Sequence, residues 1–129
     1  LALLRGQGMT TLLPVAAAPD AALVFHAFDE KTSLTKGRFG MNEPPATAPM
    51  LIPDVVLLPL VAFDPVSGQR LGHGMGHYDR TLEALRAQKK PHVIGLAYDF
   101  QACDGLPAES HDQPLDCVVT PSRVYSFKS

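Results

Sequence analysis

Two apolar runs that do not alternate with polar residues constrain this chain more than any other feature. The first covers residues 53–59 (Pro-Asp-Val-Val-Leu-Leu-Pro), and the second covers residues 92–97 (His-Val-Ile-Gly-Leu-Ala). A run without alternation predicts a strand covered on both faces, as in a parallel sheet flanked by helices. Residues 78–87 between the two runs favour a helix. The stretch therefore predicts a βαβ unit with a right-handed crossover.

Shorter elements are predicted on both sides of this unit. Residues 1–8 read as the last turns of a helix that Gly6 and Gly8 terminate. Short apolar runs predict further strands at residues 9–15, 21–28, 115–120 and 124–127. Residues 29–53 contain four prolines, which exclude long regular structure, so a long loop is expected there.

Composition limits the classes of protein to which the chain can belong. Its 129 residues fit a single α/β domain, and 46% apolar with 19% charged residues is typical of a globular protein. A net charge of −2 provides no basic surface for nucleic acid or a membrane, so an anionic ligand needs a local site. Cys103 and Cys117 lack CxxC spacing, and no apolar run is long enough to span a bilayer. A reducing, cytoplasmic setting is therefore expected.

The segment between the first run and the helix carries the clearest chemical signal. Residues 70–80 read Arg-Leu-Gly-His-Gly-Met-Gly-His-Tyr-Asp-Arg, with glycine at Gly72, Gly74 and Gly76. Alternating glycines let several backbone N–H groups converge on an anion without interference from a Cβ. The following helix would add its N-terminal dipole, which also favours negative charge. Phosphate is the expected ligand.

Known phosphate-binding patterns do not match this segment. The Walker pattern is absent, and the dinucleotide pattern GxGxxG fails because the third glycine comes one position early. Asp79 can cap the helix or hold Mg²⁺, and Arg80 can bind phosphate oxygens or form a surface ion pair. Both alternatives stay open for each residue.

Four aromatic or imidazole side chains are candidate ligand-binding groups. His73 and His77 have the spacing of a helical metal pair, but the glycines between them disfavour a helix, so donation to an anionic substrate or simple solvation is favoured over zinc. The ring of Tyr78 either packs under the loop or turns its hydroxyl towards a ligand. His26 is interpreted as an ordinary strand residue.

Seven segments, in order along the chain, carry a family resemblance. They are Phe39–Pro44, Asp54–Pro59, Val61–Asp64, Gly68, Arg70–Arg80, Ile94–Tyr98 and Glu109–Asp116. Together they resemble the 5-formyltetrahydrofolate cyclo-ligases, also called methenyltetrahydrofolate synthetases. The resemblance extends over nearly the whole chain.

This resemblance implies a fold and an activity. The expected fold is a three-layer α/β/α Rossmann-like domain with a mostly parallel central sheet, formed by residues 1–129 and lacking an N-terminal helix that supplies Lys and Arg to ATP in the family. The implied reaction is the ATP- and Mg²⁺-dependent closure of 5-formyltetrahydrofolate to 5,10-methenyltetrahydrofolate, with release of ADP and phosphate. The implied partners are ATP and a reduced folate, with no nucleic acid, no membrane and a monomeric chain.

The resemblance also implies roles for individual residues. ATP is expected to bind at Gly72, His73, Gly74, Met75, Gly76, His77, Tyr78 and Asp79. The folate is expected to contact Phe39, Met41, Glu43 and Tyr78. The implied catalytic residues are His77, Tyr78 and Arg80, and the implied Mg²⁺ ligands are Asp79 and Asp112.

The sequence departs from the family at His77, where tyrosine is common, and at Met75, where a small or basic residue is common. Two other functions remain alternatives. One is a truncated, catalytically weak relative that binds folate or nucleotide. The other is a sugar-phosphate isomerase or transferase, which predicts a carboxylate facing the glycine segment and no need for nucleotide.

Overall fold

The computed structural model describes residues 2–16, 21–37, 40–71, 77–106 and 115–127. The chain divides into two compact units, Leu1–Pro53 and Asp54–Ser129. The single domain expected for residues 1–129 stays a prediction. No helix in the described ranges is long and apolar enough to cross a membrane.

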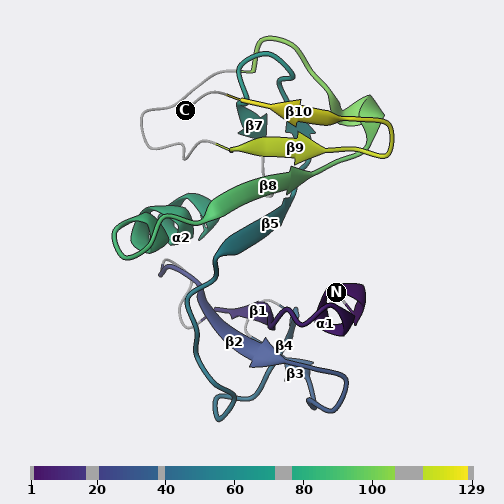
Figure 1. The fold of residues 1–129 in the computed structure, drawn as a ribbon. Coiled ribbons are helices and arrows are strands. Elements are labelled where there is room, and N and C mark those ends of the chain that lie inside the picture. The colour runs from purple at the N-terminus through teal and green to yellow at the C-terminus, as the bar shows by residue number, and fades with distance from the viewer. Residues whose placement is uncertain (1, 17–20, 38–39, 72–76, 107–114, 128–129) are drawn as a thin grey trace. The chain divides into compact units, whose positions relative to one another are not determined.

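A four-stranded sheet forms the centre of the second unit (Figure 1). Its strand order is β10 (Val124–Ser126), β9 (Cys117–Val119), β8 (His92–Leu96) and β5 (Val55–Pro59). The β5–β8 and β8–β9 pairs are parallel, and β10 is antiparallel to β9. The predicted mostly parallel sheet is therefore confirmed, as are the two strands of the predicted βαβ unit, β5 and β8, with β5 at the edge of the sheet.

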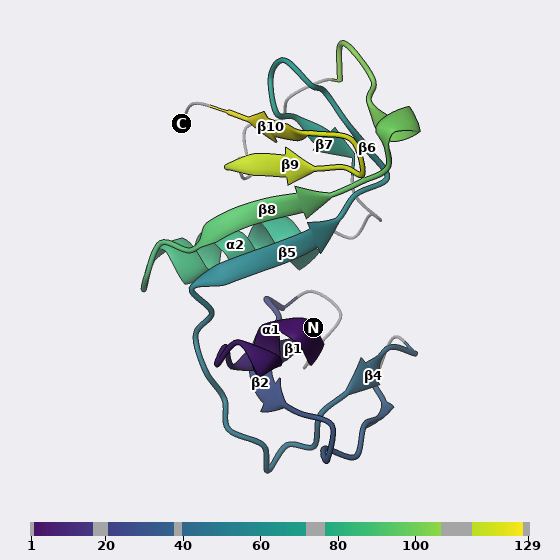
Figure 2. The same ribbon diagram turned by 45° about the vertical axis from the view of Figure 1, so that its right-hand side comes forward.

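Helix α2 (His77–Arg86) connects β5 to β8 and covers one face of the sheet (Figure 2). The buried positions of the helix include Thr81, Leu82 and Leu85, whose spacing places them on one helical face. The buried side chains of the sheet are Val56, Leu58, Val93 and Val118. Full burial of each such aliphatic side chain contributes about 1.5–3 kcal/mol, so this layer forms the core of the unit.

The other face of β5 is exposed. Val56 and Leu58 are buried, whereas Val55 and Leu57 are 51% and 38% exposed. Successive side chains of a strand point to opposite faces, so the alternation assigns one face to the core and one to the surface. The prediction that both faces of this strand are covered therefore does not hold within this unit.

A short hairpin leads from β5 towards α2. It consists of β6 (Ala62–Phe63) and β7 (Arg70–Leu71), which pair antiparallel. Gly68 in the connecting turn has φ 79°, a conformation that glycine adopts without steric cost. Phe63 is fully buried and packs edge to face against Tyr125, with ring centroids 5.1 Å apart. The hairpin is thereby anchored on the sheet, and its second strand ends where the glycine segment begins.

The first unit contains helix α1 (Ala2–Gly6) and an antiparallel pair, β1 (Thr11–Val15) and β2 (Val24–Phe28). Both predicted strands and the helix end are confirmed. Gly8 follows the helix with φ 88°, the left-handed conformation that commonly ends helices.

Residues 29–53 are more regular than the sequence predicts. They contain the two-residue strands β3 (Thr35–Lys36) and β4 (Asn42–Glu43), which form a hairpin. Further along, Ala27 N donates to Pro49 O over 2.8 Å, and Leu51 N donates to Phe25 O over 3.0 Å. The prolines prevent long strands, but they leave enough N–H groups for short pairings.

The buried ring of His26 adds to this pairing, because its Nδ1 lies 2.9 Å from Ala48 O. The interpretation of His26 as a strand residue is confirmed, since it lies within β2.

Candidate functional site

The predicted site residues fall partly outside the described ranges. Gly72, His73, Gly74, Met75 and Gly76 lie there, as do Phe39 and Asp112. The described site residues form two groups. Tyr78, Asp79 and Arg80 lie in the first turn of α2, which begins at His77, and Met41 and Glu43 lie on the β3–β4 hairpin.

An ion pair joins the two residues that flank the glycine segment. Arg70 Nη2 on β7 lies 2.5 Å from Asp79 Oδ1 on α2. The arginine side chain is 9% exposed and the aspartate side chain 21% exposed, so the pair is shielded from solvent screening. A short charge-assisted hydrogen bond of this kind is stronger than a neutral one.

This pair adds a role for Asp79 beyond the cap and the metal ligand considered from the sequence. Arg70 was not recognised as its partner, because nine positions separate the two residues in the chain. One feature of the sequence could have indicated the pair: the two residues carry opposite charges and lie at the two ends of a segment whose glycines favour a tight turn. Arg80, the next residue, is half-buried on the same helix.

Tyr78 is half-buried near the start of α2. It lies three, four and seven positions before Thr81, Leu82 and Leu85, on the helical face that packs against the sheet. Burial raises the pKa of its hydroxyl above the ordinary value of 10.0. Tyr78 is therefore a neutral hydrogen-bond donor at neutral pH, and its ring has the partial burial that either of its predicted orientations requires.

Glu43 is half-buried on β4, and Met41 at the hairpin turn is 64% exposed. Oε2 of Glu43 accepts a hydrogen bond of 3.0 Å from the backbone N–H of Ala16, just after β1. The carboxylate is thereby held in a defined position, although its strand is only two residues long.

Asp64 is a buried carboxylate whose role no sequence pattern indicates. Its Oδ1 accepts from Val66 N and Ser67 N, and its Oδ2 accepts from Gly105 N over 2.9 Å. These backbone donors, led by Val66, hold the pKa of the carboxyl below its ordinary value. Asp64 therefore stabilises the β6–β7 turn and connects it to the loop that contains Gly105.

Asp99 is a second carboxylate whose role no sequence pattern indicates. It lies in the short helical turn η1 (Asp99–Gln101) after β8. The hydroxyls of Ser122 and Thr120 each donate to Oδ1 over 2.6 Å. These bonds lower the pKa of Asp99. The hydroxyls come from the turn between β9 and β10, so Asp99 links the ends of two neighbouring parallel strands.

The described residues do not form a complete metal centre. Within the described ranges, no three side chains of His, Cys, Asp or Glu gather in a way that could hold a metal ion. Mg²⁺ in nucleotide sites needs only one or two carboxylates, because phosphate and water supply its other ligands. A single carboxylate such as Asp79 is therefore compatible with Mg²⁺.

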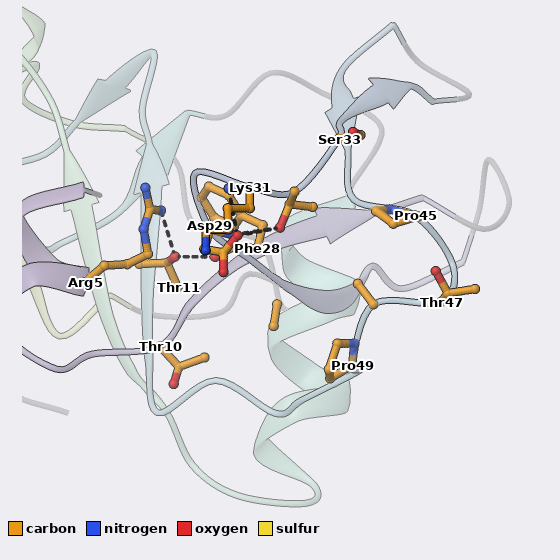
Figure 3. A pocket seen from close by; sticks show the side chains of 13 residues that line it. Arg5, Thr10, Thr11, Phe28, Asp29, Lys31, Ser33, Pro45, Thr47 and Pro49 are labelled. Atoms are coloured by element: carbon orange, nitrogen blue, oxygen red, sulfur yellow. Dashed lines mark hydrogen bonds between the residues drawn. The ribbon is translucent and has the colours of Figure 1, made fainter.

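A recess of about 700 Å³ lies in the first unit (Figure 3). Arg5 on its wall donates to Thr11 Oγ1 over 3.0 Å and lies 5.1 Å from the ring centroid of Phe28. Asp29 accepts from Lys31 N, which lowers the pKa of its carboxyl. These charged groups serve local contacts, and the recess includes none of the predicted site residues.

The mostly parallel sheet, the β5–α2–β8 crossover and the glycine-rich approach to α2 define an α/β protein with a candidate anion site at the start of α2. The sequence matches the 5-formyltetrahydrofolate cyclo-ligase family over residues 1–121. The chain belongs to this family.

Individual relatives support this assignment. The 5-formyltetrahydrofolate cyclo-ligase of Escherichia coli (strain K12) is 40% identical over 109 residues, which cover 81% of this chain and 59% of the relative. The enzyme of that name from Saccharomyces cerevisiae is 36% identical over 105 residues, covering 75% of this chain and 50% of the relative.

The solved structure of Aquifex aeolicus 5,10-methenyltetrahydrofolate synthetase matches with a TM-score of 0.72 and 32% identity. The match covers 92% of this chain and 58% of that one. The chain thus spans between half and three-fifths of the length of these relatives.

Proposed function

We propose that this chain is part of a 5-formyltetrahydrofolate cyclo-ligase that forms 5,10-methenyltetrahydrofolate with ATP and Mg²⁺ and releases ADP and phosphate. The observation that carries the proposal is the family match over residues 1–121. In this reaction the formyl oxygen receives the γ-phosphoryl group of ATP. N10 then attacks the activated formyl carbon, and phosphate leaves.

The proposed roles around α2 follow from the demands of phosphoryl transfer, which depends mainly on positioning and charge stabilisation. The glycine segment would supply backbone N–H donors, and His77 and Arg80 would add side-chain donors. Tyr78 would donate from its neutral hydroxyl, consistent with its raised pKa. The Arg70–Asp79 pair supports this assignment, because it ties together the two ends of the proposed phosphate-binding segment.

Mg²⁺ would be held by Asp79 together with Asp112 and would neutralise charge on the phosphates. The 21% exposure of Asp79 supports this role, because part of the side chain remains accessible beside Arg70.

Glu43 would bind the folate, and Met41 and Phe39 would contact it as well. A carboxylate is a suitable acceptor for the N–H groups of a reduced pterin. The hydrogen bond from Ala16 N supports this role, since it fixes the carboxylate before substrate arrives.

We further propose that the protein has a three-layer α/β/α architecture. In this architecture α2 covers one face of the sheet, and a second helical layer covers the face on which β5 is exposed. The exposed apolar side chains Val55 and Leu57 support this arrangement, because their burial is favourable. A monomeric state and a reducing, cytoplasmic setting are part of the same proposal.

The test is the absorbance of the methenyl product after the intact protein is mixed with ATP, Mg²⁺ and 5-formyltetrahydrofolate. We expect an absorbance rise that requires both ATP and Mg²⁺. The matched reaction without ATP should stay flat. Folate binding with no turnover in any condition would reject the enzyme and favour the folate-binding relative.

A further inference from the structure

The β3–β4 hairpin places Gly37 and Glu43 on the same face. Its register pairs Thr35 with Glu43 and Lys36 with Asn42, and Gly37 N donates to Met41 O over 2.9 Å. Gly37 is therefore two positions from the residue directly opposite Glu43. Such diagonal neighbours share one face and lie close enough for a long side chain to reach across.

The Glu43 carboxylate occupies the space that a side chain at Gly37 would need. A Cβ built on Gly37 would lie 2.1 Å from Cδ of Glu43, and 2.3 and 2.4 Å from its two oxygens. These separations are far shorter than any van der Waals contact. Any other amino acid at position 37 would therefore displace the carboxylate.

The backbone itself does not demand glycine at position 37. The positive-φ glycines of the described ranges are Gly8, Gly40, Gly68 and Gly105, and Gly37 is not among them. Gly40 supplies the left-handed residue of this same turn, with φ 77°. The requirement for glycine at position 37 thus comes from the carboxylate above it.

We propose that Gly37 is a positioning residue for the folate-binding carboxylate. The missing side chain of Gly37 leaves the space in which the Glu43 carboxylate rests, and Ala16 N holds Oε2 there. This inference rests on the proposed function of Glu43, and it assigns a role in substrate binding to a residue that does not itself contact the substrate.

The Gly37→Ala variant distinguishes an effect on the position of the Glu43 carboxylate from an effect on folding. The clashing atoms are the far end of a flexible side chain, so the carboxylate can swing away without displacing backbone. We expect the melting temperature to change little and the KM for 5-formyltetrahydrofolate to rise about tenfold, the effect of losing one hydrogen bond to a charged group. The KM for ATP should stay unchanged.

Gly6→Ala is the matched control, because a Cβ at Gly6 meets no atom within 4 Å. Its kinetics should equal those of the unmodified protein. In a Glu43→Ala background, Gly37→Ala should raise the folate KM no further, since the group through which it acts is gone. A further rise of the same size, an unchanged folate KM in Gly37→Ala alone, or failure of that variant to fold would each overturn the proposal.

A second measurement does not depend on turnover. By NMR, the amide shift of Ala16 should follow the titration of the Glu43 carboxyl in the unmodified protein and in Gly6→Ala, but not in Gly37→Ala. An Ala16 amide that still follows the carboxyl in Gly37→Ala would refute the positioning role. Absence of turnover in the unmodified protein would instead reject the proposed function, and the NMR comparison would still decide the role of Gly37.

Discussion

Arg70 and Asp79 show how two side chains can define the ends of a loop. They lie on β7 and α2, at opposite ends of the glycine segment, and their ion pair is largely shielded from water. A glycine-rich segment has high conformational freedom, which makes it costly to order. A fixed connection between its ends reduces that cost, so this pair is expected to matter for both stability and ligand affinity.

Replacement of Arg70 by Leu should lower the free energy of unfolding by about 3 kcal/mol, because it leaves a poorly solvated carboxylate without this cation. It should also raise the KM for ATP. Urea unfolding and steady-state kinetics measure the two effects.

The matched control is Lys89→Leu, which breaks the pair between Lys89 and Asp54. Both of those side chains are more than half exposed, so the cost should stay within about 1 kcal/mol. Equal losses in the two variants would contradict the importance assigned to the shielded pair.

At the scale of elements, the connections that follow the parallel strands meet at the carboxyl ends of these strands. Strands β5, β8 and β9 run in the same direction, and their carboxyl ends lead into the β6–β7 hairpin, η1 and the β9–β10 turn. Asp99 joins two of these connections through the hydroxyls of Thr120 and Ser122. Asp99 thus has a structural role at this edge of the sheet.

The stability of this junction should depend on pH through Asp99. Its pKa is lowered below the ordinary value of 3.8, chiefly by Ser122 and Thr120. A carboxyl with a depressed pKa binds its proton less tightly in the folded than in the unfolded state. Its contribution to stability is therefore present above pH 3.8 and is lost as the pH falls through the folded pKa.

Asp99→Asn should be less stable than the unmodified protein at neutral pH, and the difference should shrink in acid. Urea midpoints at neutral pH and below pH 3.8 measure this. Asp104→Asn, at an exposed aspartate of the same segment, is the control. A constant difference across the pH range would exclude a role for the ionised carboxylate.

At the scale of the molecule, apolar burial is concentrated in one of the two units. Apart from prolines, the buried apolar side chains of the described residues all belong to Asp54–Ser129. They are Val56, Leu58, Leu60, Phe63, Leu82, Leu85, Val93, Leu115 and Val118. In the first unit, the polar residues Thr11 and His26 are buried, and each side chain makes a hydrogen bond to a backbone oxygen. Hydrophobic burial is the dominant stabilising contribution, so the two units should differ in local stability.

Amide hydrogen exchange of the intact protein should reveal this difference. We expect the slowest exchange in β5, β8 and β9, and faster exchange in β1 and β2, because opening the latter exposes less apolar surface. Equal protection in both sets of strands would show that the first unit is stabilised by contacts beyond its own core.

The sequence by itself determined the four sheet strands and the α-helix of the second unit, and it determined the family. The apolar runs 53–59 and 92–97, the glycines between them and the helical pattern of 78–87 are local signals, and local periodicity is sufficient to predict β5, α2 and β8. The ordered segments from Phe39–Pro44 to Glu109–Asp116 were sufficient for the family, since their order along the chain is itself specific.

Only the tertiary structure decided which residues support the candidate site. Arg70 meets Asp79, Glu43 lies over Gly37, and Asp99 binds two hydroxyls more than twenty positions away. The tertiary structure also decided that one face of β5 is exposed within its own unit, although the apolar run of this strand predicted two covered faces. Such features depend on which parts of the chain become neighbours after folding, and no local pattern encodes that.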